Sequence, residues 1–188
     1  MRIIAGKYRS RPLKSLPGMN TRPTSDRLRE TLFNVLTASA PQTLEGSLWL
    51  DVFAGTGAVG IEALSRGAHA ATFIDNNRVA LRVIRDNLKS LGITDGFEIV
   101  EHDASRSLRQ LDALASAFDY VFLDPPYAMT VAYEETLGFL GQSRILKQDS
   151  VVIAEHDKRY DPGEGFGALR RYRTLIQGDS GLSFYHLS

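Results

Sequence analysis

The chain has 188 residues, no cysteine, and equal numbers of basic (22) and acidic (22) side chains. Its length suits a single domain with one main core, and its hydrophobic share of 43% is ordinary for a globular protein. The lack of cysteine excludes disulfides and thiolate metal sites, and no run approaches the roughly 18 apolar residues of a membrane span, so we expect a cytoplasmic protein.

The first part of the chain is basic. Residues 1–30 hold eight Lys and Arg against two acids, and the remainder holds 14 against 20, so a segment of net charge +6 precedes a body of −6. This asymmetry suggests a polyanionic partner that touches one end of the chain. The alternative is a segment that its charges merely keep soluble. We call residues 1–30 the basic arm.

Residues 1–40 are predicted to form a small N-terminal extension. Two short β-like pieces, residues 2–5 and 8–13, predict a hairpin around Gly6. Further on, T-S-D-R-L-R-E-T-L-F-N-V-L predicts a helix that Thr24 or Ser25 caps. Its apolar face would be made of Leu28, Leu32, Val35 and Leu36.

Residues 41–188 are predicted to form an α/β body. Strand-like segments (48–53, 71–74, 97–100, 120–123 and 151–154) alternate with helix-like ones (58–66, 78–91, 105–114 and 132–140). This alternation predicts a doubly wound, mostly parallel sheet covered on both faces. Residues 169–177 and 182–187 follow as two strands joined by a turn, which predicts an antiparallel terminal hairpin.

The first predicted strand of the body leads into a glycine loop. The sequence D-V-F-A-G-T-G-A-V-G, residues 51–60, contains G-x-G-x-x-G, whose glycines permit a tight turn and let a ligand approach the backbone. The helix that follows presents free N–H groups. A purely structural turn is the alternative, because this motif alone is a weak signal.

Three acids follow three successive strands. Asp75 is placed to accept hydrogen bonds from ribose hydroxyls, a feature that fits NAD equally well. Asp51, four residues before Gly55, would repel a pyrophosphate but suits a cofactor that carries cations, such as S-adenosylmethionine. Asp51 could instead cap the following turn. Asp103 could reach an adenine amino group or could cap a helix.

The fourth strand ends in F-L-D-P-P-Y-A-M, residues 122–129. A carboxylate on Asp124 and a proline-held carbonyl could accept both N–H groups of an exocyclic amine and aim its lone pair at a methyl group. Tyr127 could stack on the base, a contact worth roughly 1 to 3 kcal/mol. Proton loss would accompany or follow methyl transfer, since an ordinary aspartate is too weak a base to act first. The alternative is a rigid turn at the end of a strand.

These motifs together resemble a known family. The D-P-P-Y motif, with D-V-F-A-G-T-G-A-V-G-I-E-A-L-S-R-G-A upstream, is similar to class I S-adenosylmethionine-dependent amino-methyltransferases. The N-terminal R-I-I-A-G and T-R-P-T-S-D-R-L-R-E-T-L-F-N resemble the bacterial 16S ribosomal RNA (guanine-N2)-methyltransferase family. The resemblance implies a Rossmann-like seven-stranded sheet, S-adenosylmethionine as cofactor, no metal, and a monomer that methylates 16S ribosomal RNA, either as naked RNA or in the small subunit.

The resemblance also implies residue roles. The catalytic residues would be Asp124, Pro125, Pro126 and Tyr127. The cofactor would be bound by Asp51, Phe53, Ala54, Gly55, Thr56, Gly57, Asp75, Asn76, Asp103 and Ala104. The RNA would be gripped by Arg2, Lys7, Arg9, Arg11, Lys14 and Arg22.

Other functions fit parts of this pattern. The same catalytic set could methylate an adenine of DNA or RNA, or a glutamine amide of a protein. An NAD-dependent oxidoreductase would use the glycine loop but leave D-P-P-Y unexplained, and a non-catalytic RNA-binding module would leave the acids idle. The four histidines, His69, His102, His156 and His186, show no metal-ligand spacing.

Overall fold

A computed structural model of the protein describes residues 1–16, 25–38 and 41–188. The helices are α1 (Asp26–Thr37), the 3-10 helix η1 (Pro41–Leu44), α2 (Ala58–Ser65), α3 (Arg78–Leu91), α4 (Ala104–Ala113) and α5 (Thr130–Leu140). The strands are β1 (Leu48–Val52), β2 (Ala70–Asp75), β3 (Phe97–Glu101), β4 (Phe118–Leu123), β5 (Leu146–Asp157), β6 (Gly165–Phe166), β7 (Leu169–Gln177) and β8 (Ser180–Leu187). In this part of the chain, no helix is long and apolar enough to cross a membrane.

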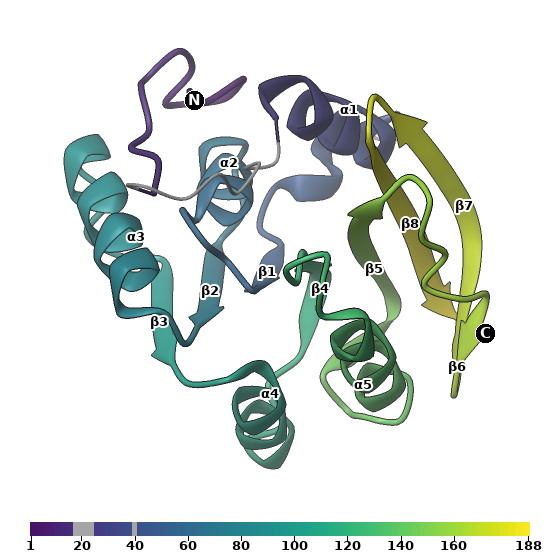
Figure 1. Ribbon diagram of the computed structural model, residues 1–188. Coiled ribbons are helices and arrows are strands. Elements are labelled where there is room, and N and C mark those ends of the chain that lie inside the picture. The colour runs from purple at the N-terminus through teal and green to yellow at the C-terminus, as the bar shows by residue number, and fades with distance from the viewer. Residues whose placement is uncertain (17–24, 39–40) are drawn as a thin grey trace.

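The strands form one sheet in the order β3-β2-β1-β4-β5-β8-β7-β6 (Figure 1). The first five in this order run parallel to one another, whereas β8 runs antiparallel to both β5 and β7. The chain moves outward from β1 to β3 and then returns to β4 on the other side of β1. In open α/β sheets ligands bind at the carboxyl ends of the strands where the order reverses, here between β1 and β4.

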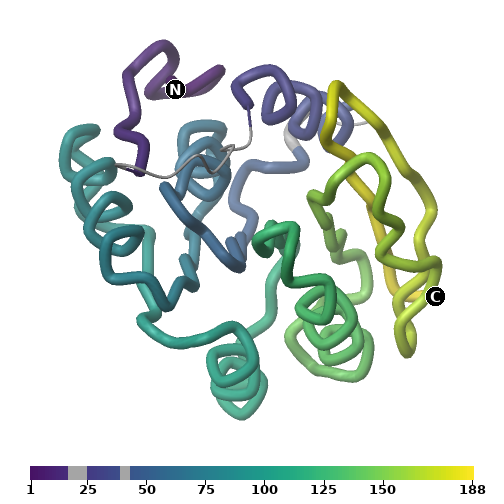
Figure 2. Tube along the Cα trace, in the orientation of Figure 1, coloured from purple at the N-terminus to yellow at the C-terminus, as the bar shows by residue number. Residues whose placement is uncertain are grey.

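Helices cover both faces of the sheet (Figures 1 and 2). On one face α1, α2 and α3 bury Phe33, Ile61 and Ile84 in a cluster with the sheet. On the other face α4 and α5 bury Leu108 and Leu137. We call these the α2 face and the α4 face. Both faces of the sheet are covered by buried apolar side chains, as is typical of a parallel sheet.

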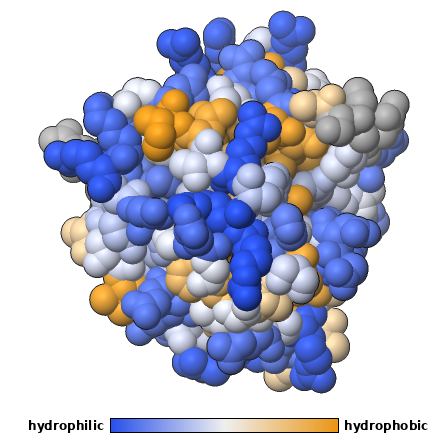
Figure 3. Space-filling view, turned by 90° about the vertical axis from the view of Figure 1, so that its right-hand side faces the viewer, coloured by the Kyte–Doolittle hydropathy of each residue, from blue (hydrophilic) through white to orange (hydrophobic). Residues whose placement is uncertain are grey.

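The outer edge of the sheet is charged. The edge strand β7 carries Arg170, Arg171 and Arg173, and it is covered only by the two residues of β6. Figure 3 looks onto this side and shows a mainly hydrophilic surface with smaller hydrophobic areas. Charged side chains on an edge strand discourage pairing with another chain.

The predicted doubly wound α/β fold with an antiparallel terminal hairpin is confirmed. Helix α3 and strand β7 have the bounds that the sequence predicts. The prediction of seven strands is wrong by one, because the two-residue β6 pairs with the start of β7 and is too short to leave a pattern. Strand β5 has 12 residues where four were predicted, since Lys147, Gln148 and Asp149 interrupt its apolar run.

The N-terminal extension is part of the core. The predicted hairpin is reduced to a single antiparallel bridge between Arg2 and Pro12, because Pro12 has no N–H to continue a ladder. Ile3 and Leu13 are buried in the α2-face cluster. Residues 1–16 thus share the core of the body, and the domain boundary near residue 40 stays a prediction.

Helix α1 begins where the capping pattern predicts. The Ser25 hydroxyl oxygen accepts a hydrogen bond from the Leu28 N–H at 3.1 Å, which satisfies one of the free donors of the first turn. The alternative cap Thr24 lies outside the described residues, and so does Arg22, one of the predicted RNA contacts.

Candidate active site

Three acids from neighbouring strands converge on the α2 face. Asp51 of β1 is paired with Phe122 of β4, and the β4–β5 pairing places Asp124 beside Glu155. Because side chains alternate along a strand, Asp51, Asp124 and Glu155 all project to the same side of the sheet. The carboxyl edge therefore gathers three carboxyl groups at the point where the strand order reverses.

A cleft of about 1060 Å³ opens over these acids. Its walls come from the glycine loop, from residues 124–129, from the arm at Ser15 and Leu16, and from Lys158 and Arg159 after β5. The sequence-predicted residues that line it are Asp51, Phe53, Ala54, Gly55, Thr56, Asp75, Asn76, Asp124, Pro125, Pro126 and Tyr127. The volume suits a drug-sized ligand together with part of a second one.

A smaller pocket of about 160 Å³ adjoins the cleft. The two share Phe53, Asp75, Asn76 and Met129 as walls, and the smaller one continues to the predicted Asp103 and Ala104. An elongated ligand can therefore reach from the glycine loop past Asp75 to the start of α4.

The glycine loop has the backbone conformation that its sequence demands. Phe53, Gly55 and Gly57 have positive φ values of 62°, 57° and 74°. A left-handed Phe is costly, so its presence at the mouth of the cleft marks a backbone that the surrounding structure holds in place. Gly57, a predicted cofactor residue that lines neither the cleft nor the smaller pocket, ends this turn as the N-cap of α2.

The Asp51 carboxylate both bonds to the backbone of α2 and lines the cleft. Its Oδ2 accepts the Gly60 N–H at 2.9 Å, so the predicted capping role is real. Asp51 also lines the cleft. Burial raises the pKa of Asp51 to about 8, the Gly60 N–H opposes this shift, and the nearby Asp75 adds to it. A buried acid of this kind is stabilised in its charged form by a cation in the cleft.

Asp75 organises the loop that it faces. Its two carboxylate oxygens accept the N–H groups of Gly55 and Asn77, each at 2.8 Å. Burial raises the pKa of Asp75, and these N–H donors partly offset that effect. Each carboxylate oxygen retains a second lone pair, so the predicted role toward a ribose is compatible with this geometry.

Asp103 caps helix α4. Its Oδ1 accepts the Arg106 N–H at 2.8 Å, which is the second of the two roles that the sequence leaves open. The residue is exposed at the wall of the smaller pocket. A contact from its other oxygen to a ligand stays a prediction.

The D-P-P-Y loop is held to the sheet at its start and is closed by a hydrogen bond of its own at its end. The Asp124 N–H donates to the Val52 carbonyl of β1 at 3.3 Å, and the Met129 N–H donates to the Pro126 carbonyl at 2.7 Å. The Pro126 oxygen is thus engaged within the loop, which favours the Pro125 carbonyl as the acceptor for an amine. Burial raises the pKa of Asp124 well above its ordinary range, and Glu155 and Asp51 raise it further.

Sequence reasoning missed Glu155 as part of the site. It is almost fully buried at the end of β5, beside Asp124, and its Oε1 lies 3.4 Å from the Tyr127 hydroxyl. Ser180 of β8 is also close, with its Oγ 3.1 Å from that hydroxyl. The sequence signal that could have indicated Glu155 is its place in the mainly apolar run V-V-I-A-E-H. An acid in a buried run needs a partner, which makes it a candidate site residue.

The predicted RNA contacts within the described residues are all exposed. Arg2, Lys7, Arg9, Arg11 and Lys14 lie on the surface of the arm. Lys14 pairs with Asp86 at 2.9 Å, and Arg11 donates to the Ser90 carbonyl at 2.8 Å, both on α3. Contacts of this kind at the surface contribute little, so the cations can turn to a phosphate.

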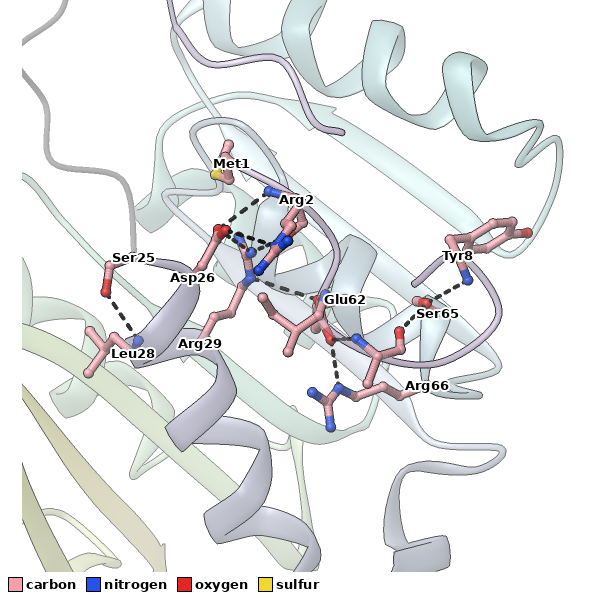
Figure 4. Close-up of polar contacts among 12 residues, drawn as sticks. Met1, Arg2, Tyr8, Ser25, Asp26, Leu28, Arg29, Glu62, Ser65 and Arg66 are labelled. Atoms are coloured by element: carbon pink, nitrogen blue, oxygen red, sulfur yellow. Dashed lines mark hydrogen bonds and ion pairs between the residues drawn. The ribbon is translucent and has the colours of Figure 1, made fainter. Parts of the chain in front are cut away.

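Helix α2, which begins at the glycine loop, also holds the arm (Figures 2 and 4). The Glu62 carboxylate accepts the N–H groups of Ile4 and Ala5 at 2.8 and 3.0 Å and pairs with Arg66 at 2.8 Å. The Ser65 carbonyl accepts the Lys7 N–H at 2.7 Å. The arm is therefore fastened to the element that faces the cleft.

A second set of hydrogen bonds joins the arm to the glycine loop through Asn87 of α3. The buried Asn87 side chain accepts the Lys14 N–H at 2.8 Å and donates to the Thr56 carbonyl at 3.0 Å. The basic arm is therefore fixed to the glycine loop that lines the cleft.

Comparison with known proteins gives consistent results. The family model described as "Conserved hypothetical protein 95" matches residues 1–186. The chain is 37% identical to Ribosomal RNA small subunit methyltransferase D of Escherichia coli strain K12, over 84% of this chain and 75% of that protein. It is 36% identical to the protein of that name from Haemophilus influenzae, over 84% and 79%. A solved structure from Thermus thermophilus matches with a TM-score of 0.83 at 29% identity, covering 98% of each chain.

Proposed function

The chain belongs to the family described as Conserved hypothetical protein 95, and from this premise we propose that it transfers a methyl group from S-adenosylmethionine to the exocyclic N2 amine of a guanine in 16S ribosomal RNA. The observation that carries this proposal is the junction of the glycine loop and the D-P-P-Y loop in one cleft. The relatives named as small-subunit ribosomal RNA methyltransferases support the choice of RNA.

The residues of the cleft fit S-adenosylmethionine. Burial raises the pKa of Asp51 to about 8, and a cation in the cleft would stabilise its carboxylate, whereas an anionic pyrophosphate would not. When bound, the cofactor supplies a methyl group on a positively charged sulfur. The glycine loop with Asp51 would hold its amino-acid part, Asp75 its ribose, and the pocket at Asp103 and Ala104 its adenine.

The D-P-P-Y loop would orient the target amine. Asp124 and the Pro125 carbonyl accept its two N–H groups, and Tyr127 stacks on the base. Because burial and neighbouring acids raise the pKa of Asp124, its carboxylate can take the proton that the amine loses. This differs from the sequence-based expectation of an ordinary, weakly basic aspartate.

The basic arm would bind the RNA around the target. Its exposed cations lie on the same unit as the cleft, with Ser15 and Leu16 at the cleft wall. A guanine inside RNA structure would be splayed out to reach Asp124. We infer that the protein acts as a monomer, on ribosomal RNA in the cytoplasm.

The proposal is tested by incubating the protein with labelled S-adenosylmethionine and small ribosomal subunits from cells that lack this gene. We expect label on the N2 of one guanine. The Asp124→Ala variant should lose transfer by about 10²-fold or more while cofactor binding, measured by calorimetry, persists.

The exposed Asp149, on the same sheet, gives a matched control, and Asp149→Ala should transfer as the wild type does. Label on adenine, on protein or on no product would reject the guanine assignment. Loss of cofactor binding in Asp124→Ala would show that the residue is structural.

A further inference from the structure

The Tyr127 ring is anchored at its far end. Its hydroxyl lies 3.1 Å from the Ser180 Oγ and 3.4 Å from the Glu155 Oε1, while the residue as a whole is 36% exposed and lines the cleft. Ser180 and Glu155 are only 5% and 2% exposed and are not among the described residues that line the cleft, so they lie behind the ring. The tyrosine therefore bridges the ligand cleft and the interior of the sheet.

The two anchoring residues stand on rigid elements. Glu155 is paired with Leu182, and Asp157 with Ser180, in the antiparallel ladder between β5 and β8. The Glu155 carbonyl also accepts the Tyr133 hydroxyl of α5 at 2.9 Å. Side chains held on paired strands keep their position better than side chains on loops.

The surroundings of Glu155 are acidic and partly aromatic. Asp124 lies beside Glu155 on the α2 face, with Asp51 close to Asp124. The Tyr127 hydroxyl faces the Glu155 carboxylate, whereas the Tyr133 hydroxyl donates to its backbone carbonyl. On the cleft side, Lys158 pairs with Asp179 and Arg159 pairs with Asp157, each at 3.0 Å. The acid pair Asp124 and Glu155 thus shares one crowded space.

We propose that Glu155 and Ser180 are positioning residues for methyl transfer, which hold Tyr127 by its hydroxyl so that its ring presents a fixed face to the target base. Glu155 also keeps its neighbour Asp124 ready to receive a proton. This inference rests on the proposed function and assigns the C-terminal antiparallel strand a part in the active site.

The proton acceptor matters because of the charge that the reaction creates. As the nitrogen–carbon bond forms and the sulfur–carbon bond breaks, the bonding pair stays with sulfur and the nitrogen becomes positively charged. That charge leaves as a proton, which Asp124 takes and later gives to water. A negative neighbour makes a carboxylate a better proton acceptor.

The first test removes the anchor and keeps the ring. Tyr127→Phe and Ser180→Ala should each raise the KM for RNA by about 2- to 10-fold, because the ring must then be immobilised on binding. The double variant should be no worse than Tyr127→Phe, since loss of the tyrosine hydroxyl already removes the contact that Ser180→Ala deletes. Cofactor affinity should not change.

Two matched controls separate positioning from folding. Tyr133→Phe deletes a hydroxyl that is bonded to the same residue, but at its backbone carbonyl. Ser183→Ala deletes a buried hydroxyl of β8 that is bonded to His156 at 3.0 Å. Both should leave the KM for RNA at the wild-type value. A wild-type KM in Tyr127→Phe, or an equal rise in the controls, would overturn the proposal.

The second test needs no methyl transfer. In Glu155→Gln, the carboxyl carbon of Asp124, followed by NMR, should titrate at a lower pH than in the wild type, and the acid limb of the kcat profile should move the same way. An unchanged Asp124 titration would refute the role of Glu155. A wild type that methylates no RNA, with the NMR shift present, would contradict the proposed function and leave this coupling standing.

Discussion

At the scale of single residues, the three acids predicted to bind the cofactor also hold the backbone around the two pockets. Asp51 caps α2 through Gly60, Asp75 holds Gly55, and Asp103 caps α4. An acid that fixes the backbone around a ligand is already oriented when the ligand arrives, so no ordering cost falls on binding. The structural and functional interpretations of these acids are therefore compatible.

Asp51 should make the ligand-free protein less stable as pH rises. Its pKa is about 8 in the folded state, against an ordinary value of about 3.9 in the unfolded chain, so between these values the folded state binds the extra proton. Stability from this group is highest below about pH 4, falls through this window and is constant above about pH 8. Urea unfolding at several pH values should show the fall, with a smaller slope in Asp51→Asn.

The same measurement contains its own check. The difference in unfolding free energy between wild type and Asp51→Asn should change in favour of the variant as pH increases from 5 to about 8. A pH-independent difference would mean that Asp51 is ionised throughout this range.

At the scale of elements, helix α2 contacts both the glycine loop of the cleft and the basic arm. Its first residue follows the glycine loop, and its Glu62 and Ser65 hold the arm (Figure 4). It lies tightly on β2, because a Cβ at Gly60 would come within 2.4 Å of the Phe73 ring. The third glycine of the motif is thus needed for packing rather than for the turn.

Gly60→Ala should destabilise the protein by about 1 to 3 kcal/mol, because the added methyl group forces α2 away from β2. It should also weaken cofactor binding, since the loop moves with the helix. Gly138→Ala in α5 is the matched control, because a Cβ there meets nothing within 4 Å.

The control should instead stabilise by about 0.4 to 1 kcal/mol, through a less flexible unfolded chain. Denaturant unfolding and calorimetry measure both effects. Equal stability of the two variants would argue against close packing of α2 on Phe73.

At the scale of the whole molecule, the arm and the cleft form one surface. Eight Lys and Arg lie in residues 1–30, but Arg29 is fully buried, where it pairs with Asp26 at 2.9 Å and lies 3.8 Å from Glu62. Burial lowers the pKa of Arg29, and these acids counter that effect. At most seven cations of the arm can therefore meet phosphates.

The salt dependence of RNA binding should reveal these cations. Seven contacts to single-stranded phosphates give a slope of log affinity against log salt near −5 as an upper bound, by about 0.7 per contact. Arg9→Ala with Arg11→Ala should weaken binding and flatten the slope by about 1.4. The exposed Arg109 and Arg144, on the α4 side, are the matched control, and their removal should leave the slope unchanged. An unchanged slope in the arm variant would remove the arm as the RNA-binding element.

The sequence alone was sufficient for the fold class and for the two motifs whose residues line the cleft. Alternation of strands and helices reflects local hydrophobic periods, and the glycine loop and D-P-P-Y are contiguous, so both can be recognised in one dimension. The sequence did not predict the two-residue β6 or the polar first half of β5, because their strand conformation depends on pairing partners rather than on a local pattern.

Only the tertiary structure decided which groups act together. Glu155 and Ser180 join Tyr127 across 28 and 53 residues of sequence, and Glu62 holds the arm across 57. The raised pKa values of Asp51 and Asp124 likewise depend on burial and on acids from other strands. Sequence specifies the chemical groups and their local geometry, whereas their protonation, their partners and the junction of arm and cleft depend on distances through space that no local pattern records.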